Sequence, residues 1–377
     1  MTSIATENPI TPRATPPVIG PDPRDLNVQA RILPDVSRTF ALTIPELPDA
    51  LEVVVANAYL LCRIVDTIED DPDLDTSTKA TYLAGFMSVL EGEVDAADFA
   101  TQLSERLSER TKPAERELIE NTPAVVRITA AFSPTQQQAL RRCVEKMAAG
   151  MAEFQRNKTL DGLPTLLDLD RYCYFVAGIV GEMLTDLFCE YCPELEAQRD
   201  ELMALAVCFG QGLQMTNILK DIWEDRESNT CWLPRSVFAD LDDGGLAGAL
   251  ERQDARALAS GIEELVGIAH AHLQSALRYT QIIPKQEAGV RRFCLWAIGM
   301  ALLTLRGIHN NPGYRHGNDV KISRRAVKAT ILACNVALAS NRVTQALFDT
   351  ASRGLPLATG GNFCPPPGAL TASDRLA

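Results

Sequence analysis

The chain has 377 residues and a formal net charge of −13, and 46% of its residues are hydrophobic and 23% charged. This composition is typical of a globular protein with a sizeable core. The acidic charge argues against a nucleic-acid partner, because nucleic acids are bound by clustered basic side chains.

The first 25 residues lack the apolar segment of a secretory signal, and no uninterrupted apolar run reaches the roughly 18 residues that cross a bilayer. Ten cysteines among mostly apolar neighbours are typical of reduced, buried thiols. We therefore expect a cytoplasmic protein without a transmembrane segment.

The pattern of apolar residues predicts one large all-α domain. These residues recur at three- and four-residue intervals, the period of an amphipathic helix, in residues 51–71, 136–156, 198–225, 262–283 and 288–309. Strand-like alternation is nearly absent, and no composition shift marks a domain boundary. The proline-rich ends lack this period, which predicts a flexible arm over residues 1–26 and a flexible tail over residues 351–377, around a domain of residues 27–350.

Prolines mark several of the expected helix ends. Pro48 precedes a helix that starts near Asp49, and Pro72 ends it, because proline is tolerated in the first turn of a helix but not in its interior. Pro134 directly follows Ser133, whose hydroxyl is a good cap for the first turn. A second helix is therefore expected to start at this pair.

An acidic cluster lies at the far end of the first of these helices, in the sequence RIVDTIEDDP (63–72). Tyr59, Arg63, Asp66 and Asp70 are spaced by four, three and four residues, which places them along one helix face, with Glu69 beside it. Carboxylates in a last turn face the negative end of the helix dipole, so a bound cation would stabilise them. Mg²⁺ suits carboxylate oxygens and commonly also takes phosphate oxygens. Asp71 lies off this face and is expected to be solvated.

A second polar stripe follows in GLQMTNILKDIWED (212–225). Asn217, Asp221 and Asp225 recur at four-residue intervals on a helix that is otherwise apolar. Either stripe alone could be a solvated acidic helix end, since charge runs are usually exposed. Two such stripes on two apolar helices instead predict a cavity in which Mg²⁺ ions hold a diphosphate group.

The chemistry of such a site follows from its two parts. Diphosphate becomes a good leaving group once metal ions neutralise its charge. Its departure from an allylic ester leaves a carbocation, which an apolar pocket with aromatic faces protects from water. The sequence thus predicts an enzyme acting on an apolar diphosphate ester.

Six stretches occur in a characteristic order: SRTFALTIPELP (37–48), YLLCRIVDTIEDDP (59–72), MAEFQRN (151–157), RYCYFVAGIVGEMLTDLF (171–188), LQMTNILKDIWED (213–225) and WLP (232–234). In this order and spacing they resemble the squalene/phytoene synthase family of head-to-head prenyl transferases, across roughly residues 27–345. The resemblance implies an isoprenoid synthase-type helical bundle around a central cavity. It also implies Mg²⁺ ligands in both stripes, namely Asp66, Glu69, Asp70, Asn217, Asp221 and Asp225.

The same resemblance implies roles for further residues. Tyr172 matches a tyrosine of the first half-reaction, as acid/base or cation stabiliser, with a buried structural tyrosine as the alternative; together with Asp66, Asp70, Asp221 and Asp225 it forms the expected catalytic set. The expected substrate-binding residues are Ser37, Arg38, Phe40, Tyr59, Arg63, Gln214 and Phe293. The expected cofactor-binding residues are Arg38, Arg63, Lys220, Lys321 and Arg324.

Within the family, the sequence favours a squalene synthase that condenses two molecules of farnesyl diphosphate and reduces the product with NADPH. Residues 291–326 resemble the squalene synthase C-terminal half, and VKIS (320–323) resembles a basic segment linked to NADPH. Ser323 stands where eukaryotic squalene synthases have arginine, and a Gly-Arg pair usual before Trp232 is absent. Each difference weakens the prediction of a cofactor more than that of a diphosphate site.

Two alternatives remain. The first is a phytoene or dehydrosqualene synthase, which eliminates a proton and uses no NADPH. The second is a noncatalytic isoprenoid-binding or assembly protein of the same fold, which would have no need of two metal stripes. A bacterial enzyme of sterol or hopanoid supply is the better match, and we expect a monomer that is cytoplasmic or peripheral to the inner membrane.

Overall fold

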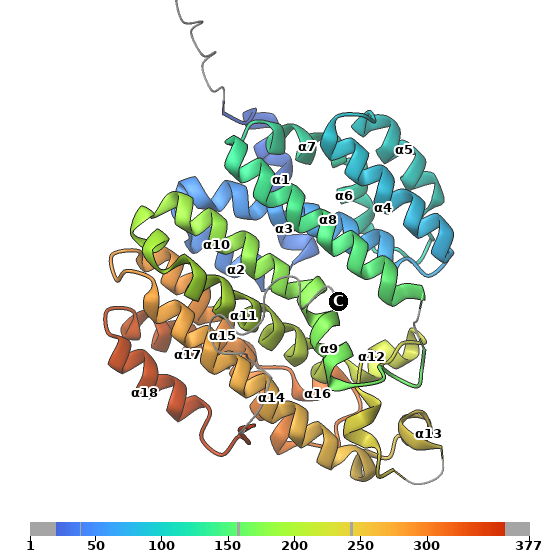
Figure 1. Cartoon of the computed structure of the whole chain (residues 1–377), viewed down its shortest axis with the longest axis vertical. Helices are drawn as coiled ribbons and strands as arrows, with labels where there is room; N and C mark the ends of the chain where they lie inside the picture. The colour runs from blue at the N-terminus through green and yellow to red at the C-terminus, as the bar shows by residue number, and fades with distance from the viewer. Residues whose placement is uncertain (1–19, 38, 157–158, 242–243, 359–377) are drawn as a thin grey trace, which may run out of the picture.

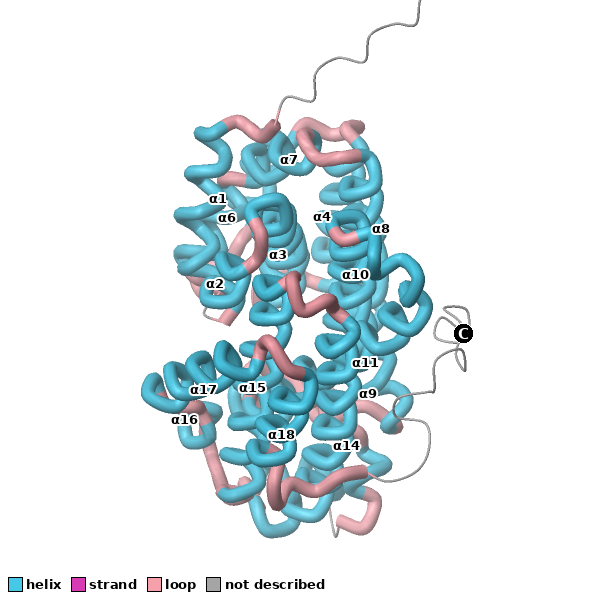
Figure 2. The backbone as a smooth tube through the Cα atoms, turned by 90° about the vertical axis from the view of Figure 1, so that its left-hand side faces the viewer, coloured by secondary structure: helices cyan, strands magenta, loops and turns pink. Residues whose placement is uncertain are grey.

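The computed structural model describes residues 20–37, 39–156, 159–241 and 244–358. Within these ranges the chain forms helices joined by loops and contains no β-strand, apart from one isolated bridge between Leu163 and Pro234 (Figures 1 and 2). The predicted all-α fold is therefore confirmed.

The helices follow one another in the order α1 (Pro23–Val36), α2 (Phe40–Thr43), η1 (Ile44–Glu46), α3 (Asp49–Asp70), α4 (Thr76–Glu91), α5 (Ala96–Arg106), α6 (Pro113–Glu120), α7 (Thr122–Ala130), α8 (Pro134–Arg156), α9 (Leu166–Cys173), η2 (Tyr174–Gly178), α10 (Ile179–Tyr191), η3 (Pro193–Gln198), α11 (Arg199–Lys220), α12 (Ile222–Glu227), η4 (Arg235–Phe238), α13 (Gly245–Glu251), α14 (Ala255–Ile282), α15 (Ala288–Asn310), α16 (Gly317–Val320), α17 (Arg324–Ala337) and α18 (Asn341–Ala351).

Each of the five periodic segments is helical, and the expected helix ends occur where the prolines stand. α3 begins at Asp49 and ends at Asp70, two residues before Pro72. α8 begins at Pro134, and the Ser133 hydroxyl accepts a hydrogen bond from the backbone N–H of Gln136 at 3.1 Å. The segment 198–225 is interrupted at Asp221, which lies between α11 and α12.

The helices form two groups that meet at the centre of the molecule. Figure 1 shows α1 and α3 to α8 in the upper part, α9 and α11 to α18 in the lower part, and α10 between α8 and α11. α8 packs on α3, α4 and α10, and α11 packs on α10, α14 and α15. α3 and α11, which carry the two polar stripes, therefore belong to different groups and approach one another across the centre.

Glycines allow the lower helices to pack closely behind this centre. A Cβ atom on Gly210 of α11 would lie 2.2 Å from the carbonyl oxygen of Ala177, and one on Gly181 of α10 would lie 2.3 Å from the carbonyl oxygen of Ala206. Ala177 belongs to η2, a π-helical turn within the continuous helix from α9 to α10. Such turns add a residue to the helix and frequently occur at functional sites. This close packing brings η2 and α11 together as one wall.

Both ends of the domain extend further than the sequence predicted. α1 begins at Pro23, where Asp22 caps its first turn, so residues 23–26 are helical and not part of a flexible arm. Asp25 anchors them through two hydrogen bonds from Arg127, at 2.7 and 2.9 Å. At the other end, Ala358 N–H donates to the carbonyl of Gly267 on α14, so residues 352–358 pack on the bundle. The rest of the expected arm and tail lies outside the described residues.

Three segments of the bundle are long and apolar enough to cross a membrane by length and composition alone: Leu166–Tyr191, Pro193–Lys220 and Ala288–Asn310. The sequence analysis did not predict these candidate segments, because it required an uninterrupted apolar run and these windows include polar residues. Between 61% and 67% of each window is buried inside the protein. The same segments supply α10, α11 and α15, which surround the centre of the bundle.

Candidate active site

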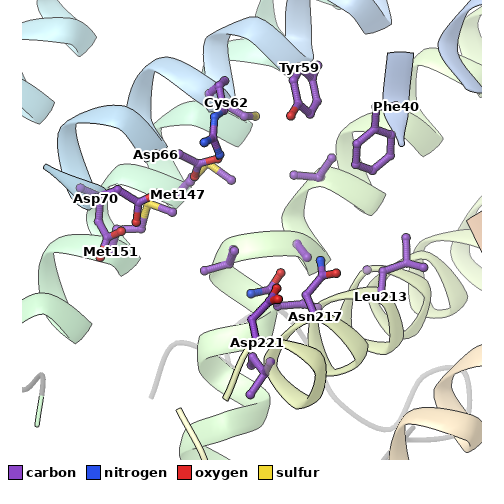
Figure 3. Close-up of a pocket in the computed structure, with 18 of the residues that line it drawn as sticks. Phe40, Tyr59, Cys62, Asp66, Asp70, Met147, Met151, Leu213, Asn217 and Asp221 are labelled. Atoms are coloured by element: carbon purple, nitrogen blue, oxygen red, sulfur yellow. The ribbon is translucent and has the colours of Figure 1, made fainter. Parts of the chain in front are cut away.

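A cavity of about 790 Å³ lies between the two helix groups. Its size falls within the range of about 300–1,000 Å³ that is usual for small-molecule sites. α3, α10, α11 and α15 all contribute to its wall. Charged side chains gather where α3 and α11 end, whereas aliphatic and aromatic side chains line the remainder (Figure 3).

The first acidic stripe lies along one side of this cavity. Asp66, Glu69 and Asp70 all line it from the last turns of α3, and Asp66 and Asp70 point into the space between the helices in Figure 3. The helix face on which the spacing puts these carboxylates is therefore the face that lines the cavity.

The second stripe lines the opposite side. Asn217, Asp221 and Asp225 contribute to the cavity wall, and Figure 3 shows Asn217 and Asp221 across the gap from Asp66. Although α11 ends at Lys220, the hydrogen bonds from Asp221 N–H to the Asn217 carbonyl and from Asp225 N–H to the Asp221 carbonyl continue the helical ladder, at 2.9 and 2.8 Å. The three polar side chains thus keep one common face despite the break in the helix.

Tyr314 holds this break in place. Its hydroxyl donates to the carbonyl of Leu219, and its own carbonyl accepts from the indole N–H of Trp223 at 2.7 Å. Glu224 accepts a hydrogen bond from the backbone N–H of Gly317 at 2.8 Å, and a Cβ atom on Gly317 would lie 3.0 Å from Oδ1 of Asp221. The segment after α15 therefore packs directly against the second stripe.

Burial leaves the negative charge of both stripes poorly compensated. Burial raises the pKa of Asp66 to about 6, although Arg63 opposes the shift, and nearby Asp70 adds to it. Burial also raises the pKa of Asp221, against the effect of Lys220, whose ammonium lies 3.0 Å from its carboxylate. Carboxylates with raised pKa values that face one another across a cavity favour a bound cation.

The donor set fits Mg²⁺. No group of three or more His, Cys, Asp or Glu side chains in the described part of the chain is arranged to hold a metal ion by itself. Mg²⁺ is usually bound by one or two carboxylates together with water and substrate phosphate, so two separated carboxylate groups suit it when a diphosphate completes the coordination.

Replacing Asp66 with asparagine is expected to raise the unfolding free energy of the metal-free protein at pH 7 by about 1–3 kcal/mol. The folded pKa of about 6 lies above the value in the unfolded chain, so wild-type stability falls as the pH rises from about 4 to 6. The variant lacks this group and should lose that part of the slope. Urea unfolding at several pH values measures the difference. Asp240→Asn, at an exposed position, is the matched control, and parallel curves for wild type and Asp66→Asn would contradict the assignment.

Four basic side chains lie at the end of the cavity that holds the carboxylates, and the sequence predicted only two of them as binding residues. Arg63 lies 3.4 Å from Asp66 and also pairs with Glu115. Lys220 lines the opposite wall. The structure adds Arg110 and Lys112, which line the cavity from the loop between α5 and α6. Four cations at the end that holds the carboxylates suit an anionic group.

Asp71 positions this additional basic loop. The sequence predicted a solvated side chain, but Asp71 is only 2% exposed. Its carboxylate accepts hydrogen bonds from the backbone N–H of Ser108 at 2.8 Å and from the hydroxyl of Thr111 at 2.7 Å, as well as from two N–H groups of its own loop. The prediction was wrong because helical spacing describes one helix face and contains no information on a loop that covers the helix end.

Tyr172 lies between the two stripes and is buried. Its ring stacks on Trp232 with centroids 3.9 Å apart and an angle of 12°, and it meets Phe154 edge-on at 5.3 Å. Burial raises the pKa of Tyr172, and the carboxylates of Glu69, Asp225 and Asp70 raise it further. The hydroxyl therefore keeps its proton at neutral pH and can donate a hydrogen bond into the polar end. The sequence does not predict the stacking partner Trp232 as a site residue, although Trp232 belongs to the WLP motif.

The remainder of the cavity is apolar and rich in aromatic rings. Phe40 lies 5.4 Å from Tyr59 and 6.5 Å from Phe293, measured between ring centroids, and Phe188 meets Phe293 edge-on at 6.3 Å. The Tyr59 hydroxyl donates to the carbonyl of Val36 at 3.0 Å, which leaves its ring toward the cavity. Such faces can stabilise a cationic carbon while excluding water. Gln214 also lines this cavity.

Other predicted residues lie elsewhere. The Ser37 hydroxyl accepts a hydrogen bond from Phe40 N–H, at the start of α2, at 3.0 Å. Ser37 also lines a neighbouring surface pocket that includes Arg63 and Lys112. Lys321 and Arg324 are exposed and do not line the central cavity. Arg38 lies outside the described residues.

Comparison with known proteins identifies the family of this chain. The family model for squalene/phytoene synthase matches residues 33–326. The chain belongs to the squalene/phytoene synthase family. A squalene synthase of Gibberella zeae is 30% identical over 297 residues, covering 78% of this chain and 61% of that protein. A squalene synthase of Candida albicans is 29% identical over 83% of this chain and 69% of its own length. The matched region thus spans 61% and 69% of the lengths of these two relatives.

Members of the family with solved structures share the fold. TcSQS, in complex with the ligand BPH1237, superposes with a TM-score of 0.70 at 24% identity, covering 88% of this chain and 98% of that one. A dehydrosqualene synthase in complex with a ligand gives a TM-score of 0.61 at 20% identity, covering 84% and 96%. At these identities the comparison shows a shared fold.

Proposed function

We propose that this family member is a Mg²⁺-dependent squalene synthase that condenses two molecules of farnesyl diphosphate head to head and reduces the cyclopropylcarbinyl diphosphate with NADPH. The observation that carries the proposal is the pairing of two acidic stripes at one end of a cavity whose other end is apolar and aromatic. Relatives named squalene synthase, at about 30% identity, support the choice of substrate.

The residues divide the work between the two ends of the cavity. The residues that would hold Mg²⁺ are Asp66, Glu69, Asp70, Asn217, Asp221 and Asp225, and the metal would neutralise the charge of the diphosphate leaving group. Arg63, Lys112 and Lys220 bind and orient the anionic ends, while Phe40, Phe188 and Phe293 contain the hydrocarbon chains and exclude water.

Tyr172 lies where the two ends meet. Its hydroxyl keeps its proton and can donate to a departing diphosphate oxygen, while its stacking on Trp232 keeps the ring in place. Among the described residues this position is suited to orient one diphosphate relative to the other substrate.

The residues expected to bind NADPH are compatible with a phosphate group. Lys321 and Arg324 are exposed and form no ion pair with other described residues. They follow the segment that packs on Asp221 and Glu224 through Gly317. NADPH would supply hydride if bound, and these two cations would hold its phosphates.

One observation favours dehydrosqualene or phytoene synthesis as the second candidate. The Ser323 hydroxyl caps α17 by accepting from the N–H of Ala326 at 3.1 Å, so the residue that replaces an arginine serves the helix instead of binding an anion. In that reaction, proton loss replaces reduction and NADPH is not consumed.

The decisive experiment incubates the purified full chain with farnesyl diphosphate and Mg²⁺, with and without NADPH, and identifies the hydrocarbon by mass spectrometry. Squalene formed only with NADPH supports the proposal. A conjugated triene formed without NADPH supports the second candidate. If farnesyl diphosphate is bound but not consumed under either condition, the protein is a noncatalytic member of the fold.

Replacing Lys321 with alanine is expected to slow reduction about tenfold while condensation changes less than about twofold, because one cation to the cofactor phosphate is lost. The cyclopropylcarbinyl diphosphate or its solvolysis products should accumulate. Single-turnover assays with both products quantified measure the two steps. Lys285→Ala, which removes an exposed lysine before α15, is the control. Equal loss of both steps would argue against a cofactor role for Lys321.

A further inference from the structure

α17 presents an apolar and basic face to solvent. Val336 is 74% exposed and Leu332 is 66% exposed. Among the exposed large hydrophobic side chains of the described residues, only Leu167, at 68%, has a comparable exposure. Arg325 and Lys328 are exposed as well. Positions 325, 328, 332 and 336 are three or four residues apart, so these four side chains share one face of the helix. We call these four residues the α17 outer face.

The opposite face of α17 packs on α15. Asn335 accepts a hydrogen bond from the indole N–H of Trp296 at 3.1 Å, and the Cys334 thiol donates to the carbonyl of Leu295 at 3.5 Å. A Cβ atom on Gly299 would lie 2.5 Å from the methyl group of Thr330. The helix is therefore held firmly by one side, and its outer face is exposed because it has no partner among the described residues. Figure 2 shows α17 at the edge of the bundle.

The charge around this face is opposite to that of the protein as a whole. Residues 320–348 contain five basic residues and no acidic one, although the chain has 49 acidic residues and a net charge of −13. The basic residues are Lys321, Arg324, Arg325, Lys328 and Arg342. The nearest acidic residue before this stretch, Asp319, accepts hydrogen bonds from the backbone N–H groups of Arg315 and His316. A basic surface on an acidic protein complements an anionic partner.

α17 also lies close to the apolar end of the cavity. Phe293, Cys294 and Ala297 of α15 line the cavity, while Leu295 and Trp296 of the same helix contact α17. One helix layer thus separates the outer face from the space that would hold hydrocarbon chains.

We propose that the α17 outer face docks on the surface of an anionic lipid bilayer, with Leu332 and Val336 among the acyl chains and Arg325 and Lys328 at the headgroups. Aliphatic side chains at the centre of a face with basic residues beside them are typical of helices that lie in the membrane interface. Basic residues favour an anionic leaflet, and this attraction weakens at high salt. The reason for such docking rests on the proposed function: the hydrocarbon product would be insoluble in water and would need a short path from the cavity to the lipid.

The test is flotation of the full chain with vesicles of phosphatidylcholine, with or without phosphatidylglycerol. The wild-type protein should float with vesicles that contain phosphatidylglycerol and remain at the bottom with pure phosphatidylcholine. Arg325→Gln/Lys328→Gln should weaken the partition coefficient about 25-fold, from about fivefold per basic residue. Leu332→Ser/Val336→Ser should weaken it at least about tenfold.

Matched controls use the same chemistry at other exposed positions. Leu167→Ser changes a leucine that is 68% exposed on α9, and Arg256→Gln/Lys285→Gln changes two exposed basic residues. Both controls should float like wild type. Turnover of farnesyl diphosphate without vesicles should be unchanged in all four variants. Flotation needs no substrate, so the docking test does not depend on activity. A protein that floats but does not turn over farnesyl diphosphate would overturn the proposed function and leave the docking proposal standing.

Other occupants of the face give different results, each of which overturns the proposal. Equal flotation of wild type and both α17 variants would assign binding to another surface. No flotation of the wild type, together with a dimer that Leu332→Ser/Val336→Ser dissociates in size-exclusion chromatography, would assign the face to a second copy. Flotation that appears only in a chain ending at Ala358 would mean that residues 359–377 cover the face.

Discussion

Asp221→Asn is expected to lower the turnover of farnesyl diphosphate at least about a thousandfold, which corresponds to about 4 kcal/mol of lost transition-state stabilisation. Asp221 lies on the cavity side of the break between α11 and α12, across the cavity from Asp66. An asparagine keeps the shape of the side chain and removes one of the charges that would bind Mg²⁺. Release of diphosphate at saturating substrate measures the loss.

The stability of the same variant separates a lost ligand from a lost fold. Burial raises the pKa of Asp221, so its charge is not stabilised by folding. Its pair with Lys220 is partly exposed, with side-chain exposures of 37% and 30%, and is worth little. The unfolding free energy should therefore change by less than about 1 kcal/mol, whereas the rise in Tm produced by Mg²⁺ with inorganic diphosphate should disappear.

Asp200→Asn is the matched control for Asp221→Asn. Asp200 is an exposed aspartate in the first turn of the same helix, outside the cavity. It should retain turnover and the Tm response to Mg²⁺ with diphosphate. Normal turnover in Asp221→Asn would contradict the assignment of the second stripe to metal binding.

Arg63→Met is expected to lower the unfolding free energy by about 3 kcal/mol, because removing one partner of a buried ion pair leaves the other charge uncompensated. Arg63 and Glu115 have side-chain exposures of only 18% and 9%. Burial acts to raise the pKa of Glu115, but Arg63 and Lys112 outweigh it and lower the pKa overall. The contribution of the pair is thus present at neutral pH and lost on acidification through the folded pKa of Glu115.

A second variant shows whether the loss is electrostatic. Arg63→Met/Glu115→Met removes both charges and should recover at least about 1 kcal/mol relative to Arg63→Met. Arg24→Met, which breaks a pair with Asp22 in which the arginine side chain is 89% exposed, should leave the unfolding free energy essentially unchanged. Urea unfolding at neutral pH compares the four proteins. An effect of Arg63→Met no larger than that of Arg24→Met would mean that the buried pair is unimportant.

The position of Arg63 connects this stability to the site. Its guanidinium contacts Asp66 of the first stripe and Glu115 of α6 in the upper helix group. Arg63 therefore orients a candidate metal ligand and joins α3 to α6, which directly follows the loop that carries Lys112. Loss of Arg63 should weaken diphosphate binding as well as the fold.

Local patterns in the sequence were sufficient for the helices and for the two stripes. The three- and four-residue spacing of Asp66 and Asp70, and of Asn217, Asp221 and Asp225, describes one face of one helix, and that geometry holds whatever the helix packs against. The proline pattern was sufficient for the start of α8 for the same reason. A helix break at Asp221 was not visible, because it depends on Tyr314 and Trp223, about 90 residues apart.

The sequence analysis missed features that depend on contacts between two distant segments, or predicted them wrongly. Asp71 was expected in solvent but anchors the loop before α6. The π-helical turn η2 has no periodic signature, and it is accommodated by Gly210 on another helix. Lys321 and Arg324 were expected at the cofactor site, and their exposure outside the cavity leaves that role a proposal.

By itself, the sequence determined that this protein is all-α, that it carries two acidic stripes, and that each stripe occupies one helix face, since these properties follow from hydrophobic periodicity and helical geometry within single segments. Only the tertiary structure decided that the stripes face one cavity and that Arg110 and Lys112 join Arg63 at its polar end. The same holds for the stacking of Tyr172 on Trp232 and for the outer face of α17, which has no partner among the described residues. Each of these depends on which helices pack together, and packing is a property of the whole bundle that the spacing within one helix does not contain.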